Sequence, residues 1–398
     1  MTRDVPPEQK EPPMDFKTRC ARGVGIIEDI GRPLSPPIVT ASTFSFESQA
    51  EVEEYYERGR GFLYSRYENP TVASAERFLA QLEEGEAAAL FASGMAAIST
   101  TLLSILRAGK RVAAQAGLYG GTIHLLNNVL PEFGIETTWF DRAELETLSP
   151  ERLRGHEVLY LETPTNPTLR IVDLRRAAKV AREAGVVTVV DSTFASPALQ
   201  TPLTLGCDVV VHSGTKYLGG HSDITAGAVV GSAELIDAIR MRRRVFGGIL
   251  DSFQAFLLQR GMRTLAVRME AHTRGAGNVA RSLLDHAGLS RVLWPGLAEH
   301  PDHAIARSQM SGFGGMVTIE LKGGAAAAER LHDRLRMFVR APSLGGIESL
   351  VSIPARMSHR HLSEAEMTKV DVTPGMVRLS IGLESPDSLV ADLLQGLT

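Results

Sequence analysis

Short runs of apolar residues recur along the first part of the chain and alternate with longer segments that have helical spacing. Helical patterns occupy residues 95–106 and 174–184, where apolar positions fall on one face. The short runs are rich in Val, Leu and Ala, and they occupy residues 87–91, 111–116, 157–162, 186–191 and 208–211. Nearly continuous apolar strands between helices are typical of a mostly parallel sheet that is covered on both faces.

One helix has a clear start and stop in the sequence. Asn69 followed by Pro70 predicts an N-cap and a first helical turn, and Gly85 marks the expected end. Between them, one face is apolar and is formed by Val72, Ala75, Leu79 and Leu82. This face predicts a helix that packs on the sheet.

The pattern changes toward both ends of the chain. Residues 316–321 and 377–381 alternate in polarity, which predicts a smaller α+β domain with one sheet face in water. The first 60 residues, with early prolines and an acidic stretch at 51–57, are expected to form a loosely structured arm. We therefore predict an arm over 1–62, a large domain over 63–260 and a small domain over 261–398.

Composition and charge narrow the class of protein. The 398 residues are 44% apolar and 22% charged, with 42 basic against 46 acidic side chains, as in a soluble globular protein with no nucleic-acid partner. The basic run at 240–244 is interpreted as a solvated helix face. No run reaches the length of a membrane span and no signal peptide is recognisable, so a cytoplasmic location without membrane partners is expected.

Cysteine and histidine usage gives no metal site or disulfide framework. Cys20 and Cys207 lie far apart in sequence, which fits a reducing compartment. Exposed or capping side chains, without a matching ligand set, are expected for His300, His303, His359 and His361.

Polar and reactive residues gather where the predicted strands end. Because parallel strands share one carboxyl edge, these residues should line one rim. The set consists of Ser93 with Gly94, Tyr119, Glu162 with Asn166, Asp191, and Ser213 with Thr215 and Lys216.

Each member also has an ordinary structural interpretation. Lys216 follows a buried strand, where apolar walls would lower the pKa of its amine, although most lysines lie in exposed loops. Ser93 and Gly94 open a helix and would bind an anion, or they form a plain N-cap. Asp191 is expected to be partly buried with a cationic partner, or to cap the next segment.

Taken together, these residues favour pyridoxal phosphate as a cofactor. An imine-forming lysine, a carboxylate for a protonated ring nitrogen, an aromatic ring and a phosphate cradle are the groups that it requires. Tyr119 would stack on the ring or act in acid–base chemistry, whereas a lone tyrosine beside glycines is usually a turn residue. Two rival motifs fail, because the segment ending at Lys216 is only half a P-loop and no dinucleotide fingerprint follows a strand.

The same residues resemble the Cys/Met-metabolism family of pyridoxal-phosphate enzymes, which includes cystathionine γ-lyase, cystathionine γ-synthase, methionine γ-lyase and O-acetylhomoserine sulfhydrylase. The match runs in family order from about residue 35 to the C-terminus, at 64–71, 92–97, 118–122, 162–167, 213–223, 343–346 and 377–384. The resemblance implies an aspartate-aminotransferase-like α/β fold (fold type I), with a mostly parallel sheet in the large domain and a smaller C-terminal α+β domain.

The resemblance also assigns roles. It implies that Lys216 binds the cofactor covalently and shuttles protons, that Asp191 pairs with the ring nitrogen, and that Tyr119 stacks on the ring. Arg378 would bind the substrate α-carboxylate near Ser343 and Asn166. The phosphate would be held by Ser93, Gly94, Met95, Ser213 and Thr215, and by Tyr64 and Arg66 of a neighbouring subunit. A dimer or tetramer with shared active sites is therefore expected.

The expected reaction is γ-elimination from a sulfur amino acid such as cystathionine, homocysteine or methionine, which gives a thiol, 2-oxobutyrate and ammonia. The alternatives are γ-replacement, as in cystathionine γ-synthase or an O-acylhomoserine sulfhydrylase, and, more distantly, a noncatalytic phosphate-binding or nucleotide-binding protein. Two positions depart from the family's specificity patterns. Pro342 stands where cystathionine-specific members usually have Glu, and Gly121 where methionine γ-lyases usually have Cys.

Overall fold

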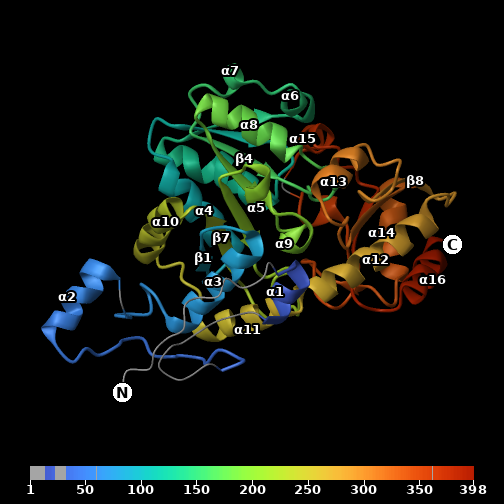
Figure 1. Cartoon of the computed structure of the whole chain (residues 1–398). Coiled ribbons are helices and arrows are strands. Elements are labelled where there is room, and N and C mark those ends of the chain that lie inside the picture. Colours follow the sequence, from blue (N-terminus) through green and yellow to red (C-terminus); the bar gives the residue numbers. More distant parts are fainter. Residues whose placement is uncertain (1–13, 23–32, 60, 361) are drawn as a thin grey trace.

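The computed structural model describes residues 14–22, 33–59, 61–360 and 362–398. Within these residues the chain forms a large sheet and a smaller sheet, each with helices packed against it (Figure 1). In chain order up to residue 263, the α-helices are α1 (Phe16–Arg22), α2 (Gln49–Arg58), α3 (Pro70–Glu83), α4 (Gly94–Ile105), α5 (Gly120–His124), α6 (Arg142–Glu146), α7 (Pro150–Leu153), α8 (Leu174–Ala184), α9 (Ser196–Leu199), α10 (Ala233–Phe246) and α11 (Ser252–Arg263). The remaining helices are α12 (Leu265–Leu283), α13 (His303–Gln309), α14 (Gly324–Arg334), α15 (Glu364–Lys369) and α16 (Pro386–Leu397).

The large sheet is mixed, with one antiparallel strand inside an otherwise parallel set. In spatial order its strands are β1 (Ala87–Phe91), β7 (Gly227–Gly231), β6 (Val209–Ser213), β5 (Val187–Asp191), β4 (Val158–Glu162), β2 (Arg111–Gln115) and β3 (Glu136–Phe140). Only β7 runs against its neighbours, so β1, β2, β4, β5 and β6 end at one edge. The predicted rim of strand ends is therefore present.

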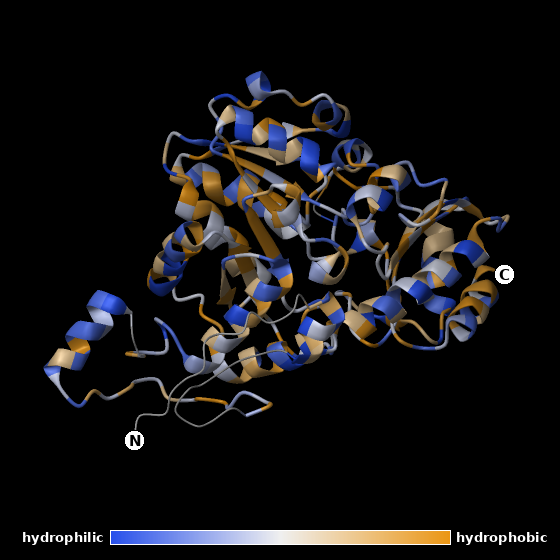
Figure 2. Cartoon of the chain, in the orientation of Figure 1, coloured by the Kyte–Doolittle hydropathy of each residue, from blue (hydrophilic) through white to orange (hydrophobic). Residues whose placement is uncertain are grey.

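Both faces of the large sheet are covered, as the apolar runs predicted. Apolar side chains of α4 and α10 pack with the sheet on one face. On the other face, α8 packs beside β4 and β5, and α3, α11 and α12 pack toward β1 and β7. Figure 2 shows the strands in the hydrophobic colour, with helices of mixed colour around them.

The smaller sheet corrects one expectation. Its order is β10 (Val339–Arg340), β11 (Leu350–Ser352), β12 (Met376–Ser380), β9 (Met316–Leu321) and β8 (Leu289–Leu293). One face packs on α12, α14 and α16, but the opposite face of β9 and β12 is not in water. Thr318 on that face donates a hydrogen bond to the Pro167 carbonyl at 2.6 Å, so the large part of the chain covers it.

Two further expectations are wrong in part. The acidic end of the arm is helical, because the Ser48 side chain accepts a hydrogen bond from the Glu51 amide and Gly59 ends α2 in the left-handed conformation. Residues 1–13 and 23–32 of the predicted arm lie outside the described residues. The basic run at 240–244 is not simply a solvated face, because Arg243 is buried and pairs with the buried Glu76 at 2.6 Å.

None of the helices among the described residues is long and apolar enough to cross a membrane.

Candidate active site

A cavity of about 670 Å³ lies at the carboxyl edge of the large sheet and is closed on its other side by the smaller sheet. Nearly all of the residues predicted from the sequence line it. They are Ser93, Gly94, Met95, Tyr119, Asn166, Asp191, Ser213, Thr215, Lys216, Ser343 and Arg378. Tyr64 and Arg66 are the two predicted residues that do not.

Lys216 lies in the turn just beyond β6, as the sequence predicted. Its Nζ donates a hydrogen bond to Ser343 Oγ at 2.6 Å, which joins the large and small parts of the chain at the cavity. Burial, and secondly the charge of Arg378, lower the pKa of the Lys216 amine to about 8. The amine is therefore much closer to its neutral, nucleophilic form at physiological pH than an exposed lysine.

Asp191 ends β5 and is 7% exposed. Its Oδ1 accepts a hydrogen bond from the Thr193 amide at 3.0 Å, and burial raises the pKa of the carboxyl group. Among the described residues it has no ion pair with a cationic side chain, so the expected partner is not supplied by these residues. A buried carboxylate of this kind suits a cationic group bound in the cavity.

The sequence predicts that Glu162 lies at the rim of strand ends, but it indicates no function for this side chain. It ends β4, and its two oxygens accept hydrogen bonds from the Tyr119 amide at 2.7 Å and the Asn166 amide at 3.1 Å. Burial, and secondly the nearby Asp191, raise the pKa of the Glu162 carboxyl well above its ordinary value. Glu162 thus fixes the backbone of two site residues that come from different loops.

The start of α4, where the sequence predicts an anion cradle, lies at the wall of the cavity. Ser93 caps the helix and accepts a hydrogen bond from the Ala96 amide at 3.1 Å, so the plain N-cap interpretation also holds. A Cβ at Gly94 would lie 3.1 Å from Ser213 Cβ, so the small residue lets β6 approach the helix start. Free amides and the helix dipole at such a start favour a bound anion.

Arg378 reaches the cavity from the middle of the smaller sheet. Its Nη1 donates to Asn166 Oδ1 at 3.0 Å and its Nη2 to the Ser343 carbonyl at 2.9 Å. Its Nε is buried and has no hydrogen-bond partner among the described residues, and burial lowers the pKa of the guanidinium to about 10. Ser343 has φ of 98°, a strained conformation for a residue with a side chain and one that often occurs at functional sites.

The ring of Tyr119 is packed against Gly121. A Cβ at Gly121 would lie 2.6 Å from Tyr119 Cε1 and 3.0 Å from Met95 Sδ. The ring is 45% exposed and lies at the start of α5. A side chain at position 121 would therefore require the Tyr119 ring or the Met95 side chain to shift.

Tyr64 and Arg66 do not reach the cavity of their own chain. Arg66 Nη1 donates a hydrogen bond to the Arg244 carbonyl at 2.7 Å, and its guanidinium lies 4.9 Å from the centre of the Tyr67 ring. Tyr64 is 40% exposed.

Sequence reasoning missed one wall of the cavity altogether. The segment 354–360 contributes Arg356, Met357, Ser358 and Arg360 to it. His359 in the same segment is 1% exposed, and burial, followed by the charge of Arg378, lowers the pKa of its ring to about 4. The expectation of an exposed or capping histidine is thus wrong for His359. His300 is buried, but its Nδ1 accepts a hydrogen bond from the Asp302 amide at 3.2 Å, as a capping side chain does, and His361 lies outside the described residues.

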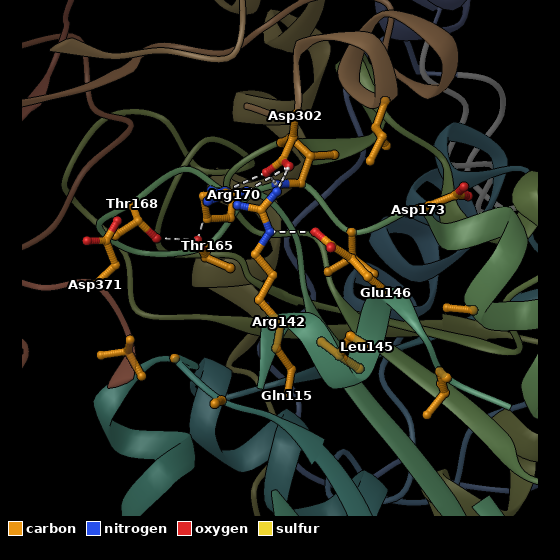
Figure 3. Close-up of a pocket in the computed structure, with 18 of the residues that line it drawn as sticks. Gln115, Arg142, Leu145, Glu146, Thr165, Thr168, Arg170, Asp173, Asp302 and Asp371 are labelled. Atoms are coloured by element: carbon orange, nitrogen blue, oxygen red, sulfur yellow. Dashed lines mark hydrogen bonds and ion pairs between the residues drawn. The ribbon is translucent and has the colours of Figure 1, made fainter. Parts of the chain in front are cut away.

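A second cavity, of about 280 Å³, is lined in part by Thr165 and Thr168 (Figure 3), which belong to the same loop as Asn166. Asp302 lies at the centre of the polar side of this cavity and is 3% exposed. Its carboxylate receives Arg170 Nε at 2.6 Å, Arg142 Nη2 at 3.0 Å and the Ile171 amide at 2.9 Å. Figure 3 shows both guanidinium groups pointing at this carboxylate. Asp302 therefore anchors the loop.

A family model described as "Cys/Met metabolism PLP-dependent enzyme" matches residues 28–398. The chain belongs to this family.

Similar proteins carry several of the activities in this family. The chain is 42% identical over 377 residues to an L-methionine γ-lyase of Fusobacterium nucleatum subsp. polymorphum, which covers 94% of this chain and 95% of that protein. It is 39% identical over 365 residues to a cystathionine γ-lyase of Bacillus subtilis (strain 168), which covers 92% of this chain and 94% of that protein. The crystal structure of cystathionine γ-synthase from Xanthomonas oryzae pv. oryzae in complex with aminoacrylate and cysteine matches with a TM-score of 0.90 at 39% identity, covering 97% of this chain and 98% of that one.

Membership in the Cys/Met-metabolism family establishes fold type I, a pyridoxal 5'-phosphate cofactor and a carbon–sulfur lyase class of enzyme. The residues of the cavity fit that cofactor. Asp191 is a buried carboxylate without a cationic partner among the described residues, the Lys216 amine has a lowered pKa, and Gly94 keeps the helix start open. The reaction thus belongs to γ-elimination or γ-replacement chemistry.

Proposed function

We propose that this enzyme catalyses γ-elimination from a sulfur amino acid such as cystathionine, homocysteine or methionine, which releases a thiol, 2-oxobutyrate and ammonia. One observation carries the proposal. The Lys216 amine, of lowered pKa, and Arg378, whose buried Nε has no hydrogen-bond partner among the described residues, face one cavity and are joined through Ser343. This arrangement places a base beside a binding group for an α-carboxylate.

Pyridoxal phosphate, when bound, supplies an electron sink that stabilises negative charge at the substrate Cα. The residues that would hold it are Asp191 at the ring nitrogen, Tyr119 on the ring face, Lys216 at the reactive carbon, and Ser93, Gly94, Met95, Ser213 and Thr215 around the phosphate.

Lys216 Nζ would remove the Cα proton of the bound substrate. Its lowered pKa leaves a substantial neutral fraction near pH 8, which general-base catalysis requires. Ser343 Oγ accepts a hydrogen bond from the same Nζ at 2.6 Å and so holds the amine in the cavity.

Arg378 binds the α-carboxylate and thereby orients the Cα–H bond toward Lys216. Asn166 Oδ1 and the Ser343 carbonyl hold its guanidinium in place, and its remaining N–H groups would be available to the substrate carboxylate. A planar guanidinium makes strong, oriented hydrogen bonds to a carboxylate. Tyr119, fixed through its amide by Glu162, is the acid that we assign to departure of the γ-substituent.

The second candidate is γ-replacement, in which a thiol adds where the γ-substituent has left. The close structural match to a cystathionine γ-synthase favours it.

Product analysis separates the two candidates. The holoenzyme is incubated with cystathionine, homocysteine or methionine, and 2-oxobutyrate and ammonia are measured. We expect keto acid from at least one of them, and none from Lys216→Ala. If no keto acid forms, but an activated homoserine ester plus cysteine or sulfide gives cystathionine or homocysteine, replacement is the reaction.

We further propose that the active unit is at least a dimer, in which Tyr64 and Arg66 complete the phosphate site of the neighbouring subunit. Two observations support this. Neither residue lines the cavity of its own chain, and the residues of that chain predicted to hold the phosphate, which are Ser93, Gly94, Met95, Ser213 and Thr215, include no cation. A phosphate dianion in a partly buried site favours a guanidinium partner.

We also propose a cytoplasmic location. Cys20 and Cys207 are both free and buried, which supports a reducing compartment.

A further inference from the structure

The mouth of the active-site cavity carries two arginines that the proposed reaction has not used. Arg356 and Arg360 line the cavity on the segment 354–360, and both side chains are exposed to solvent. The carboxylates among the lining residues are Glu162 and Asp191, both buried at strand ends. The exposed part of the cavity wall is therefore cationic among the described residues.

Neither guanidinium forms a strong ion pair within the described part of the chain. Arg360 has no side-chain hydrogen bond or ion pair with the described part of the chain. Arg356 Nη2 pairs with Glu329 Oε1 at 2.6 Å, but the two side chains are 67% and 47% exposed. Exposed pairs of this kind contribute little free energy, so a substrate anion can replace Glu329.

The segment that carries the arginines is held in a fixed position. The amides of Met357 and His359 both donate to the Pro354 carbonyl, at 3.1 and 2.9 Å. His359 is buried, and a Cβ at Gly120 would lie 2.6 Å from the Ser358 carbonyl oxygen, so the segment packs directly on the loop after Tyr119. Both arginines are thus carried by a segment that packs against the loop after Tyr119, the residue that we assign as the acid for the γ-substituent.

We propose that Arg356 and Arg360 form a subsite for a carboxylate at the far end of the γ-substituent. The inference rests on the proposed function, because it assumes that Arg378 binds the α-carboxylate. Pro342 lines the same cavity without a charge, and no exposed carboxylate among the lining residues would bind a distal ammonium. The preferred substrate class is therefore a γ-substituted amino acid with a distal carboxylate, ahead of one that ends in a neutral methyl group.

Two homoserine esters test the subsite, because both lose the same Cγ–O bond, and the succinyl ester is longer by one methylene and carries a distal carboxylate. For the wild-type holoenzyme, kcat/KM for 2-oxobutyrate formation is compared between O-succinyl-L-homoserine and O-acetyl-L-homoserine. In the double variant Arg356→Met with Arg360→Met, we expect kcat/KM for the succinyl ester to fall about tenfold or more, since charge-assisted hydrogen bonds are lost. The value for the acetyl ester should stay within about twofold.

Two control variants sharpen the result. Arg334→Met removes the same charge from an exposed position on α14 outside the cavity lining, and should leave the succinyl-to-acetyl ratio unchanged. Glu329→Gln releases Arg356 from its ion pair and should raise the preference for the succinyl ester. A ratio that is the same in wild type and the double variant would overturn the subsite.

A binding measurement separates failure of the subsite from failure of the proposed function. L-2-aminopimelate and L-2-aminoheptanoate differ in a distal carboxylate and have no γ leaving group, so calorimetry on the holoenzyme reads binding alone. We expect tighter binding of aminopimelate that disappears in the double variant. If this holds but no keto acid forms from any substrate, the subsite stands and the elimination proposal fails. If keto acid forms but neither binding nor kcat/KM depends on the arginines, only the subsite is wrong.

Discussion

The chemistry of this site begins with the surroundings of one amine. Lys216 lies between the end of β6 and the smaller sheet, and Arg378, whose charge acts on the amine, is fixed by its own hydrogen bonds. Burial and like charge both disfavour the protonated amine. The pKa near 8 is thus a consequence of where the lysine lies in the fold.

That pKa predicts how the apoenzyme captures its cofactor. Only the neutral amine attacks an aldehyde, so the rate of covalent capture should rise with pH, with a midpoint of about 8 instead of the ordinary 10.5. Stopped-flow absorbance of apoenzyme mixed with pyridoxal phosphate measures the midpoint, and Lys216→Arg should form no covalent adduct. A midpoint near 10 would contradict the buried, cationic setting of the amine.

At the residue scale, the sequence was informative where a residue follows a strand. Asp191, Lys216 and Ser93 could be placed, because apolar runs identify strands and parallel strands share an edge. Arg356 and Arg360 could not be found, because no strand or helix signal places residues 354–360 against the loop after Tyr119. Their position follows only from the packing of the smaller sheet.

At the scale of elements, two features of the structure depend on contacts between segments far apart in the sequence, and the sequence patterns did not predict them. Arg243 and Glu76 form a buried pair between α10 and α3, although the basic run predicts a solvated face. Strand β7 consists of Gly, Ala and Val, and this apolar pattern does not distinguish a parallel from an antiparallel strand. Strand direction and charge burial both depend on partners far away in the sequence.

Among the contacts between elements, the ion-pair cluster around Asp302 has the most direct effect on the active site. Asp302→Asn should destabilise the enzyme by about 2 kcal/mol or more, because it leaves Arg170 partly buried without its charged partner. The loop 165–171 should loosen and shift Asn166, so we expect KM to rise more than kcat falls. Urea unfolding and steady-state kinetics measure both effects.

The control lies in the same cluster. Glu146 pairs with Arg142 on the surface, with side chains 59% and 50% exposed, so Glu146→Gln should change stability by less than about 1 kcal/mol. Equal effects of the two substitutions would mean that Asp302 has no special role in holding the loop.

At the scale of the whole molecule, the cavity exists only where two sheets meet. Arg378 and Ser343 come from the smaller sheet and its loops, whereas Lys216 and Asp191 come from the large one. The prediction of a sheet face in water failed for this reason, since that face carries Arg378 and receives the Asn166 loop. Such a site requires the two parts to stay docked during the reaction.

The proposed assembly extends this sharing to a second subunit, and mixed oligomers test it. Arg66→Ala and Lys216→Ala should each retain little activity, but hybrids should recover it. In a hybrid, the chain with an intact Lys216 receives Arg66 from its neighbour, so a random dimeric mixture contains up to about one quarter complete sites. Mixing Asp191→Ala with Lys216→Ala is the matched control, because both residues line the cavity of their own chain and no complete site can form. Activity after co-refolding decides the question; recovery in the control, or none in the first mixture, would contradict a site shared through Arg66.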